Sequence, residues 1–323
     1  MRPSLKNSSI LVTGGAGFIG SHLVDRLLDI GAKKVVIIDN LFLGSMDNIR
    51  SAVCKGAVFF NADTEIASSI DQILAAHEID IVFNCATKAL NYSFQNPRNA
   101  YETNVTTILN LLEQQRKGAF QTLVHFSTSE VYGTAIYEPM DEKHPMNPTT
   151  TYAGGKAAAD HAVLSYAGMF DLDALIVRPF NNFGPRQNHE GPLAGVIPVT
   201  IKKILRGDSP EIHGNGEQSR NFIYVKDTVN CVVELYPKMQ AGDSINISTN
   251  KHVSINELIT KICRAMDYRG DILRRPHRQA DVFCHNASNT KLLNMIEGKL
   301  TPFETGLEWT IQWYIQEFAN TSE

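Results

Sequence analysis

The sequence predicts an α/β protein with a doubly wound parallel sheet, a Rossmann-like arrangement, and a smaller α/β C-terminal domain. Two observations in the first half predict the sheet. Short apolar runs alternate with helical patterns, and a glycine-rich stretch separates the first run from the first helix. A third observation predicts the second domain, because after Arg178-Pro179 the loops lengthen and Gly and Pro recur. We therefore expect one domain over residues 1–180 and another over residues 181–323.

Each expected strand is a short buried run, and helices separate most of them. The strands are Ser9–Thr13, Lys34–Ile38, Val58–Asn61, Asp80–Asn84, Thr122–Phe126 and Leu175–Val177. The helices are Gly20–Ile30, Ile66–His77, Ala100–Arg116 and Tyr152–Phe170. In the second half, Ser254-Ile-Asn-Glu257 forms a capping box that predicts a helix ending near Met266. The segments Tyr224–Tyr236 and Ser244–Ile247 are candidates to return to the main sheet.

Composition excludes several classes of function. The 323 residues are 43% hydrophobic and 20% charged, and a net charge of -4 gives no electrostatic reason to expect nucleic acid or an anionic membrane as partner. A polar N-terminus and the lack of any apolar run of about 18 residues predict a soluble, cytoplasmic protein. The five cysteines and ten histidines show no metal-binding spacing, so we expect neither a disulfide framework nor a metal site.

A dinucleotide fingerprint follows the first expected strand. The stretch Gly14-Gly15-Ala16-Gly17-Phe18-Ile19-Gly20 lets the backbone approach a pyrophosphate at the start of a helix. Asp39 lies about 20 residues further on, where a carboxylate binds ribose hydroxyls, and no arginine follows it directly, so NAD is favoured over NADP. Asp63 either binds the adenine amino group or is a turn residue facing solvent. The expected contacts here are Gly14, Gly17, Phe18, Ile19, Gly20, Asp39, Asn40 and Asp63.

A pair of residues on one expected helix indicates proton transfer. Tyr152 and Lys156 are four residues apart and therefore share a face. An ammonium near a phenol favours the phenolate, so we expect Lys156 to lower the pKa of Tyr152 and make it a base for alcohol oxidation. Glu130 adds a second proton-transfer group, which a simple dehydrogenase does not need.

Five motifs occur in the order typical of one family. They are "TGGAGFIG", "FSTSEVYG", "TYAGGK", "RPFNNFGPRQ" and "HGNGEQSRNFIYVKD". With them the chain resembles the extended short-chain dehydrogenase/reductases that modify nucleotide sugars: 4-epimerases, 4,6-dehydratases and decarboxylases. The stretch "STSEVYGTAIYEPMDEKHP" is most similar to dehydratases of nucleotide-linked N-acetylhexosamines, as in legionaminic acid pathways.

The resemblance implies roles for individual residues. Tyr152 and Lys156 would form the catalytic pair and also contact NAD, and Thr128 would hydrogen-bond the 4-hydroxyl of the sugar. Ser129 and Glu130 would face C5 and C6. The remaining implied residues are Pro179 at the nicotinamide, Asn181 at the diphosphate or sugar, and Arg220 and Arg278 as a diphosphate clamp, each arginine having a surface salt bridge as its alternative. The family also implies a homodimer formed by the helices Ala100–Arg116 and Tyr152–Phe170.

The chain departs from the family pattern at three places. Asn84-Cys85-Ala86-Thr87 replaces the usual His-Leu-Ala-Ala, and the sequence assigns no role to the following Lys88. Ala153-Gly154-Gly155 replaces a serine-rich spacer, which suggests the hypothesis that small residues make room for a bulky sugar substituent such as an acetamido group. Ser129 stands where the deoxythymidine-glucose dehydratases carry Asp, although the GDP-mannose dehydratases share the Thr-Ser-Glu order.

Glu130 favours one reaction among the three. A 4,6-dehydratase needs a base at C5 and an acid at C6, whereas an epimerase needs neither. We therefore expect a 4,6-dehydratase acting on a UDP- or GDP-linked N-acetylhexosamine or hexose. A 4-epimerase and a UDP-glucuronate decarboxylase remain alternatives, although the Arg-Lys-Pro run typical of decarboxylases is replaced by Arg278-Gln279-Ala280. An idle NAD-binding scaffold or sensor would be a different class, and Thr128, Tyr152 and Lys156 together argue against it.

Overall fold

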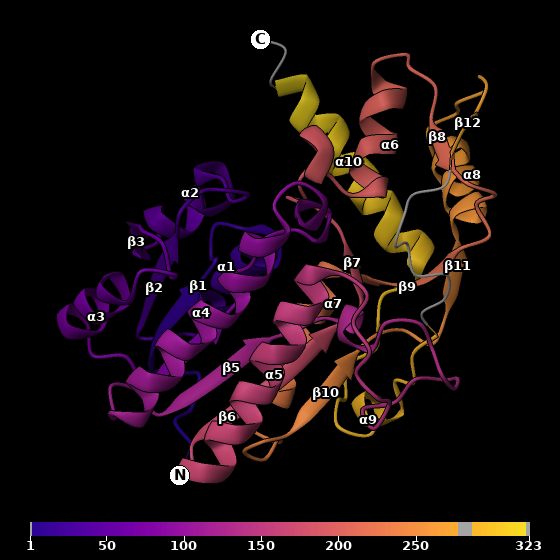
Figure 1. Cartoon of the computed structure of the whole chain (residues 1–323). Helices are drawn as coiled ribbons and strands as arrows, with labels where there is room; N and C mark the ends of the chain where they lie inside the picture. Colours follow the sequence, from indigo (N-terminus) through magenta and orange to yellow (C-terminus); the bar gives the residue numbers. More distant parts are fainter. Residues whose placement is uncertain (1, 277–285, 321–323) are drawn as a thin grey trace.

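A central parallel sheet organises the protein, whose computed structural model describes residues 2–276 and 286–320. The sheet has seven strands in the order β10-β6-β5-β4-β1-β2-β3. Its strands are β1 (Ser9–Thr13), β2 (Lys34–Asp39), β3 (Val58–Asn61), β4 (Ile81–Asn84), β5 (Thr122–Phe126), β6 (Asp173–Pro179) and β10 (Ser244–Ile247) (Figure 1). Every neighbouring pair in the sheet is parallel. The predicted fold class is confirmed.

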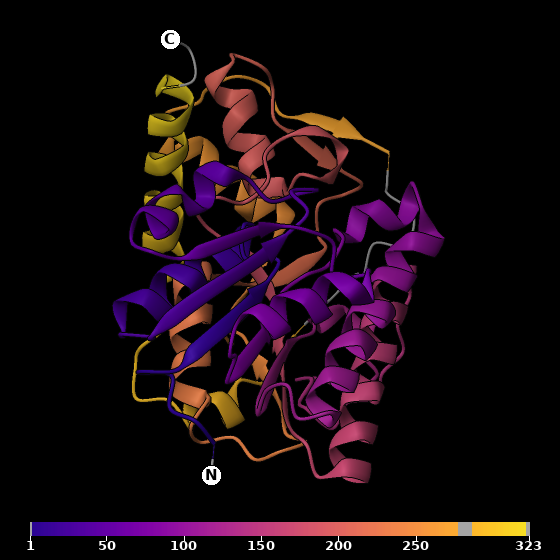
Figure 2. The same cartoon turned by 90° about the vertical axis from the view of Figure 1, so that its left-hand side faces the viewer.

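Helices cover both faces of the sheet (Figure 2). One face carries α1 (Phe18–Asp29), α2 (Met46–Cys54) and α7 (Val225–Leu235), and the other carries α3 (Ala67–Ala76), α4 (Pro97–Arg116) and α5 (Thr151–Phe170). Successive side chains of β1 point to opposite faces of the sheet, so Ile10 and Val12 pack in one core and Leu11 packs in the other. A sheet buried on both faces explains why its strands are continuous apolar runs.

Helix α2 and the length of β6 differ from what the sequence predicts, whereas the two candidate segments return to the main sheet. Helix α2 was not expected; Ser45 caps it by accepting a hydrogen bond from the Asp47 amide. Tyr224–Tyr236 returns to the main sheet as a covering helix, α7, while Ser244–Ile247 joins the sheet as β10 beside β6. Strand β6 extends past its apolar run, because the buried Arg178 finds an ion-pair partner there.

The second half of the chain builds a smaller unit. A three-stranded sheet contains β7 (Asn181–Phe183), β9 (Ser219–Tyr224) and β11 (His252–Ser254), and β8 (Glu211–His213) pairs with β12 (Leu273–Arg275). Its helices are α6 (Val196–Leu205), α8 (Ile255–Ala265) and α10 (Phe303–Asn320), whereas α9 (Thr290–Leu293) packs against β10 of the main sheet. Phe183, Ile201, Leu258 and Leu307 belong to the core of the smaller unit. Ser254 caps α8 by accepting from the Glu257 amide at 3.1 Å, so that cap is confirmed.

The adjacent glycines Gly154 and Gly155 of α5 face α4. A Cβ at Gly155 would lie 2.6 Å from the carbonyl oxygen of Tyr101, and one at Gly154 would lie 3.5 Å from the ring of the same tyrosine. Gly155 therefore allows the backbones of α4 and α5 to approach closely. The hypothesis that these glycines make room for a sugar substituent is wrong, because their missing side chains would point at Tyr101 and not into a ligand site.

This contact predicts opposite effects for two neighbouring substitutions. Gly155→Ala is expected to destabilise the protein by about 1–3 kcal/mol, since backbone atoms of Tyr101 must move. Gly154→Ala is expected to be neutral or to stabilise by up to about 1 kcal/mol, because alanine favours the helix and meets only an ordinary ring contact. Urea unfolding of both variants measures the difference. Equal stabilities would show that the two helices tolerate a methyl group at Gly155.

Candidate active site

A cavity of about 490 Å³ opens at the carboxyl ends of the main-sheet strands. It is lined by residues that end or follow six strands, namely Gly14, Asp39, Asp63, Cys85, Ser127 and Pro179. In open parallel sheets, this edge is where ligands bind. The segment that follows β7 closes the other side with Arg186, Gln187 and Asn188. The cavity therefore combines the sheet edge with the smaller unit.

The glycine-rich loop lets a ligand approach its main chain closely. Gly14 has a φ of +64°, and a Cβ at Gly20 would lie 2.2 Å from the Gly14 carbonyl oxygen, so side chains are excluded at both positions. Gly17 precedes α1 without a side-chain cap, which leaves the first amides of the helix to a ligand. The expected contacts Phe18 and Ile19 also line the cavity. This cradle fits a pyrophosphate.

Acidic and amide groups follow β2 and β3 at the same edge. The Asp39 carboxylate accepts hydrogen bonds from the amides of Ala16 (3.0 Å) and Leu41 (2.8 Å), so it also fixes the glycine-rich loop. Burial raises the pKa of Asp39, and the charge of Asp63 raises it further. Asn40 donates to Asp63 at 2.8 Å, and both line the cavity. A carboxylate at the end of β2 beside this loop fits the adenosine ribose of NAD.

Asp39→Asn is expected to weaken NAD binding about 10- to 150-fold, because hydrogen bonds to a charged group contribute about 1.5–3 kcal/mol. Calorimetric titration with NAD measures the change. Asp47→Asn is the matched control, since Asp47 lies exposed on α2. Equal affinity of the Asp39 variant and the native chain would contradict the assignment.

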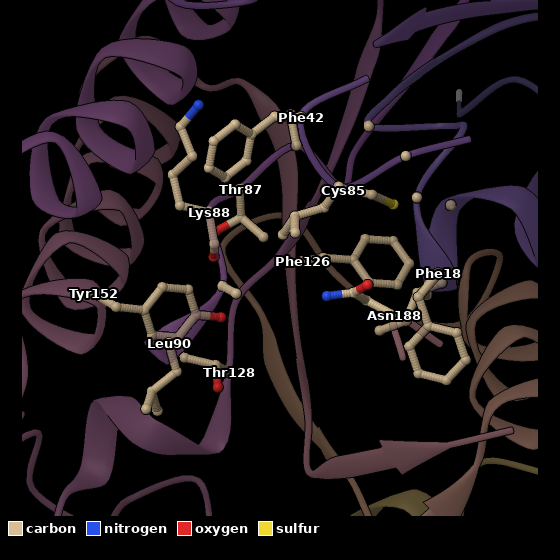
Figure 3. A pocket seen from close by; sticks show the side chains of 18 of the residues that line it. Phe18, Phe42, Cys85, Thr87, Lys88, Leu90, Phe126, Thr128, Tyr152 and Asn188 are labelled. Carbon is tan, nitrogen blue, oxygen red and sulfur yellow. The ribbon is translucent and has the colours of Figure 1, made fainter. Parts of the chain in front are cut away.

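Tyr152 lies on the cavity wall between two threonines (Figure 3). Burial raises the pKa of its phenol to about 12, hydrogen bonds with Thr128 and Thr87 oppose this rise, and the charge of Glu130 adds to it. The expected lowering of the Tyr152 pKa by Lys156 is wrong for this structure. Lys156 is not among the groups that act on the phenol, because its ammonium group is directed elsewhere.

Lys156 is buried one turn after Tyr152 on α5, with 1% of its surface exposed. Its Nζ donates a hydrogen bond to the Phe126 carbonyl at 2.7 Å, at the end of β5. Burial lowers the pKa of Lys156 to about 8, while the nearby charge of Asp160 raises it. Both Tyr152 and Lys156 line the cavity, as expected for a pair that meets one ligand.

The turn after β5 presents the remaining proton-transfer candidates. Thr128, Ser129 and Glu130 all line the cavity, and the Thr128 hydroxyl accepts from the Glu130 amide at 3.3 Å to start the short helix Ser129–Tyr132. The influence of Glu130 on the Tyr152 pKa places its carboxylate in the same site. Thr128 and Glu130 thus approach the phenol from one turn.

The expected nicotinamide contact Pro179 and the expected substrate contacts are only partly brought together. Pro179 and Asn181 line the cavity at the ends of β6 and β7. Arg220 lies on β9, which pairs with β7, but is not among the residues that line this cavity. Arg278 lies outside the described residues.

Thr87 and Lys88 are among the lining residues that were not predicted to have a role in the site. Thr87 bonds with the Tyr152 phenol, and it belongs to the stretch that departs from the family pattern. Lys88 is 8% exposed; its Nζ lies 3.8 Å from Glu65 and 4.1 Å from the centre of the Phe42 ring (Figure 3). In the sequence, the departure from the family pattern at residues 84–87 drew attention to this stretch. It did not indicate which atoms these side chains contact.

Other kinds of site are not seen in the described part of the chain. Within residues 2–276 and 286–320, no three His, Cys, Asp or Glu side chains gather as metal ligands would. Over the same residues, no helix combines the length and apolarity needed to cross a membrane.

Comparisons with known proteins agree with this geometry. A model of the NAD-dependent epimerase/dehydratase family matches residues 10–248. A putative UDP-glucose 4-epimerase from Methanocaldococcus jannaschii is 35% identical over 276 residues, which are 85% of this chain and 88% of the relative. A UDP-N-acetylglucosamine 4-epimerase structure from Methanobrevibacter ruminantium is 33% identical, with a TM-score of 0.89 over 97% of this chain and 99% of that one.

A dTDP-glucose 4,6-dehydratase structure from Streptomyces venezuelae, solved with NAD bound, is 26% identical, with a TM-score of 0.90 over 96% of this chain and 98% of that one. The predicted cofactor, NAD, is confirmed by the family and by such neighbours. The resemblance drawn from the motifs is confirmed as well. This chain belongs to the NAD-dependent epimerase/dehydratase family.

Proposed function

We propose that the protein is a nucleotide-sugar 4,6-dehydratase acting on a UDP- or GDP-linked N-acetylhexosamine or hexose. Similar proteins include both epimerases and dehydratases, so the choice rests on the site. The observation that carries it is Glu130, which lines the same cavity as Tyr152 and whose negative charge raises the pKa of the phenol. Placing a carboxylate beside a neutral sugar costs desolvation free energy. We therefore expect one only where the reaction uses it, as dehydration does.

The proposed chemistry divides the proton transfers between two residues. Tyr152 takes the proton of the 4-hydroxyl, with Thr128 holding that hydroxyl in place. When bound, NAD would supply the hydride acceptor for C4 and the hydride donor for C6. In the resulting 4-keto sugar the C5 proton is acidic, and Glu130 removes it and then protonates the C6 hydroxyl that departs as water. Addition of the hydride at C6 leaves an enolate, which gains at C5 a proton equal to the one that Tyr152 took from the 4-hydroxyl. The sugar has then lost one water, and both enzyme and cofactor return to their starting states.

A 4-epimerase is the second candidate, because the relatives that are 33% and 35% identical to this chain are both named as 4-epimerases. An epimerase shares the Tyr152 step and returns the hydride to the opposite face of C4. It leaves Glu130 without a role in the reaction. The two candidates therefore predict different products from the same first step.

Product mass separates the candidates. The purified chain with NAD is incubated with UDP-N-acetylglucosamine, with GDP-linked and deoxythymidine-linked hexoses, and with UDP-glucuronate. Loss of about 18 mass units supports dehydration, since one water leaves. An unchanged mass with an inverted C4 centre, seen by NMR, would establish the epimerase. Loss of carbon dioxide from the glucuronate would establish a decarboxylase, and no turnover with retained NAD binding would favour an idle scaffold.

The proposal includes a homodimer formed through α4 and α5. These helices make extensive contacts with each other and still expose large apolar side chains. The exposed residues are Tyr101, Leu109, Leu164, Met169 and Phe170. Such a surface is typical of a protein interface. Light scattering measures the molar mass of the purified chain in solution, and we expect that of a dimer. A monomer at micromolar concentration would contradict the proposal.

A further inference from the structure

The segment that closes the cavity opposite the sheet edge is tied to α1. Two side chains of that helix, His22 and Asp25, are three residues apart and therefore share a face. The buried His22 ring donates from Nε2 to the Pro185 carbonyl at 3.0 Å, since a carbonyl can only accept. Asp25 Oδ2 lies 2.8 Å from Arg186 Nη1, an ion pair between two half-buried side chains. One face of α1 thus holds two consecutive residues of the closing segment.

Arg186 has an unusual backbone conformation at the start of this wall. Its φ of +66° lies in the left-handed region, which residues other than glycine and asparagine seldom adopt. Such a conformation persists only where the surroundings fix it, and it is often found beside a ligand site. The fixing contacts here are those that α1 makes with Pro185 and Arg186. The next two residues, Gln187 and Asn188, line the cavity.

Other elements hold the same segment after Arg186. The Tyr314 hydroxyl on α10 donates to the Gln187 carbonyl. The Asn188 carbonyl accepts from the Gly195 amide at 3.3 Å, just before α6 begins. Figure 3 shows the side chain of Asn188 among those that line the cavity. The wall is therefore fixed by α1 at its start and by the smaller unit further on.

We propose that Arg186 is a positioning residue for the nucleotide-sugar substrate, because its ion pair with Asp25 holds Gln187 and Asn188 as a wall of the binding cavity. The inference rests on the proposed function for the class of ligand, which dehydratase and epimerase share. Helix α1 begins at the glycine-rich cradle, so one helix places both the cofactor loop and this wall. Loss of the ion pair should release the wall and weaken substrate binding, while the chemistry at Tyr152 continues.

Direct contact is the competing explanation, because Arg186 itself lines the cavity and a guanidinium can bind a diphosphate. Asp25→Asn removes the ion-pair partner and leaves the guanidinium in place. Direct contact then predicts equal or tighter binding of the substrate, whereas positioning predicts weaker binding. Arg186→Asn removes the guanidinium and introduces a residue type that tolerates a positive φ. Positioning predicts that the two single variants and the double variant lose the same affinity.

The experiment measures the affinity of the NAD-saturated full chain for UDP-N-acetylglucosamine and for a GDP-linked hexose by calorimetry, which needs no turnover. We expect Asp25→Asn and Arg186→Asn to bind the preferred ligand about five- to fiftyfold more weakly than the native chain. The KM of the converted sugar should rise by a similar factor, while kcat changes by less than about twofold. A purely structural ion pair would leave both affinity and KM unchanged.

The matched control is Asp29→Asn. Asp29 follows Asp25 by one turn on α1, lies 3.7 Å from the exposed Lys55, and does not line the cavity, so this variant should bind as the native chain does. The NAD affinity of each variant reports on α1 itself and should also stay native. A parallel loss of NAD affinity in Asp25→Asn would show a disturbed helix and would contradict a role confined to the wall.

Native affinity in Asp25→Asn beside weak binding in Arg186→Asn would overturn the proposal in favour of direct contact. Native affinity in both variants would leave the ion pair without a role in binding, and no binding of either ligand by the native chain would refute the class of ligand. Failure of the proposed function is distinguishable, because it appears as a native chain that binds these ligands but gives no dehydrated product.

Discussion

Glu130→Gln is expected to abolish water loss while leaving C4 oxidation in place. Glutamine keeps the shape of the side chain but can neither remove the C5 proton nor protonate the departing hydroxyl. General acid–base groups contribute about 10²- to 10⁴-fold to rate, so dehydration should fall by that factor. The oxidised sugar should accumulate on the enzyme, visible as reduced nicotinamide absorbance in stopped-flow mixing and as an unchanged product mass.

The matched control is Glu138→Gln, the same substitution in an exposed residue eight positions along the chain, which pairs with Asn286 outside the cavity. It should dehydrate at the native rate. Full dehydration by Glu130→Gln would assign the C5 base to another group. An epimerised product from both the native chain and the variant would show that Glu130 has no part in the reaction.

The parts of the site that were predictable depend on local spacing and on strand ends. The glycine-rich loop, Asp39 and the turn at Thr128 each follow a parallel strand, and the carboxyl ends of such strands meet at one edge. Tyr152 and Lys156 share a helix face, so their approach to the same cavity is fixed by helix geometry alone.

The rest depended on contacts between distant segments, which no local pattern encodes. Lys156 is directed to the Phe126 carbonyl, so burial determines the Tyr152 pKa in place of the expected ammonium. Glycine is needed at position 155 because a Cβ there would collide with the backbone of Tyr101 on α4. Thr87 meets the phenol because the segment after β4 and the first turn of α5 line the same cavity. In each case the deciding partner lies thirty or more residues away.

Tyr152→Phe is expected to lower the rate of C4 oxidation by about 10²- to 10⁴-fold, because the 4-hydroxyl loses its base. Removal of one hydroxyl should leave NAD affinity nearly unchanged, so the loss falls on the chemical step. The measurement is a single turnover with excess enzyme, followed by the absorbance of reduced nicotinamide. Tyr166→Phe is the matched control on the same helix, since its hydroxyl bonds to Glu113 away from the cavity.

The pH dependence of the C4 oxidation rate distinguishes loss of the base from a disturbed fold. Burial raises the pKa of Tyr152 to about 12, so near neutral pH the phenol is protonated and the phenolate fraction increases about tenfold with each pH unit. The oxidation rate of the native chain should therefore rise with pH through the neutral range. That rise should be absent in Tyr152→Phe and present in Tyr166→Phe. If Tyr152→Phe retained it, another group would titrate, and Tyr152 would not be the base.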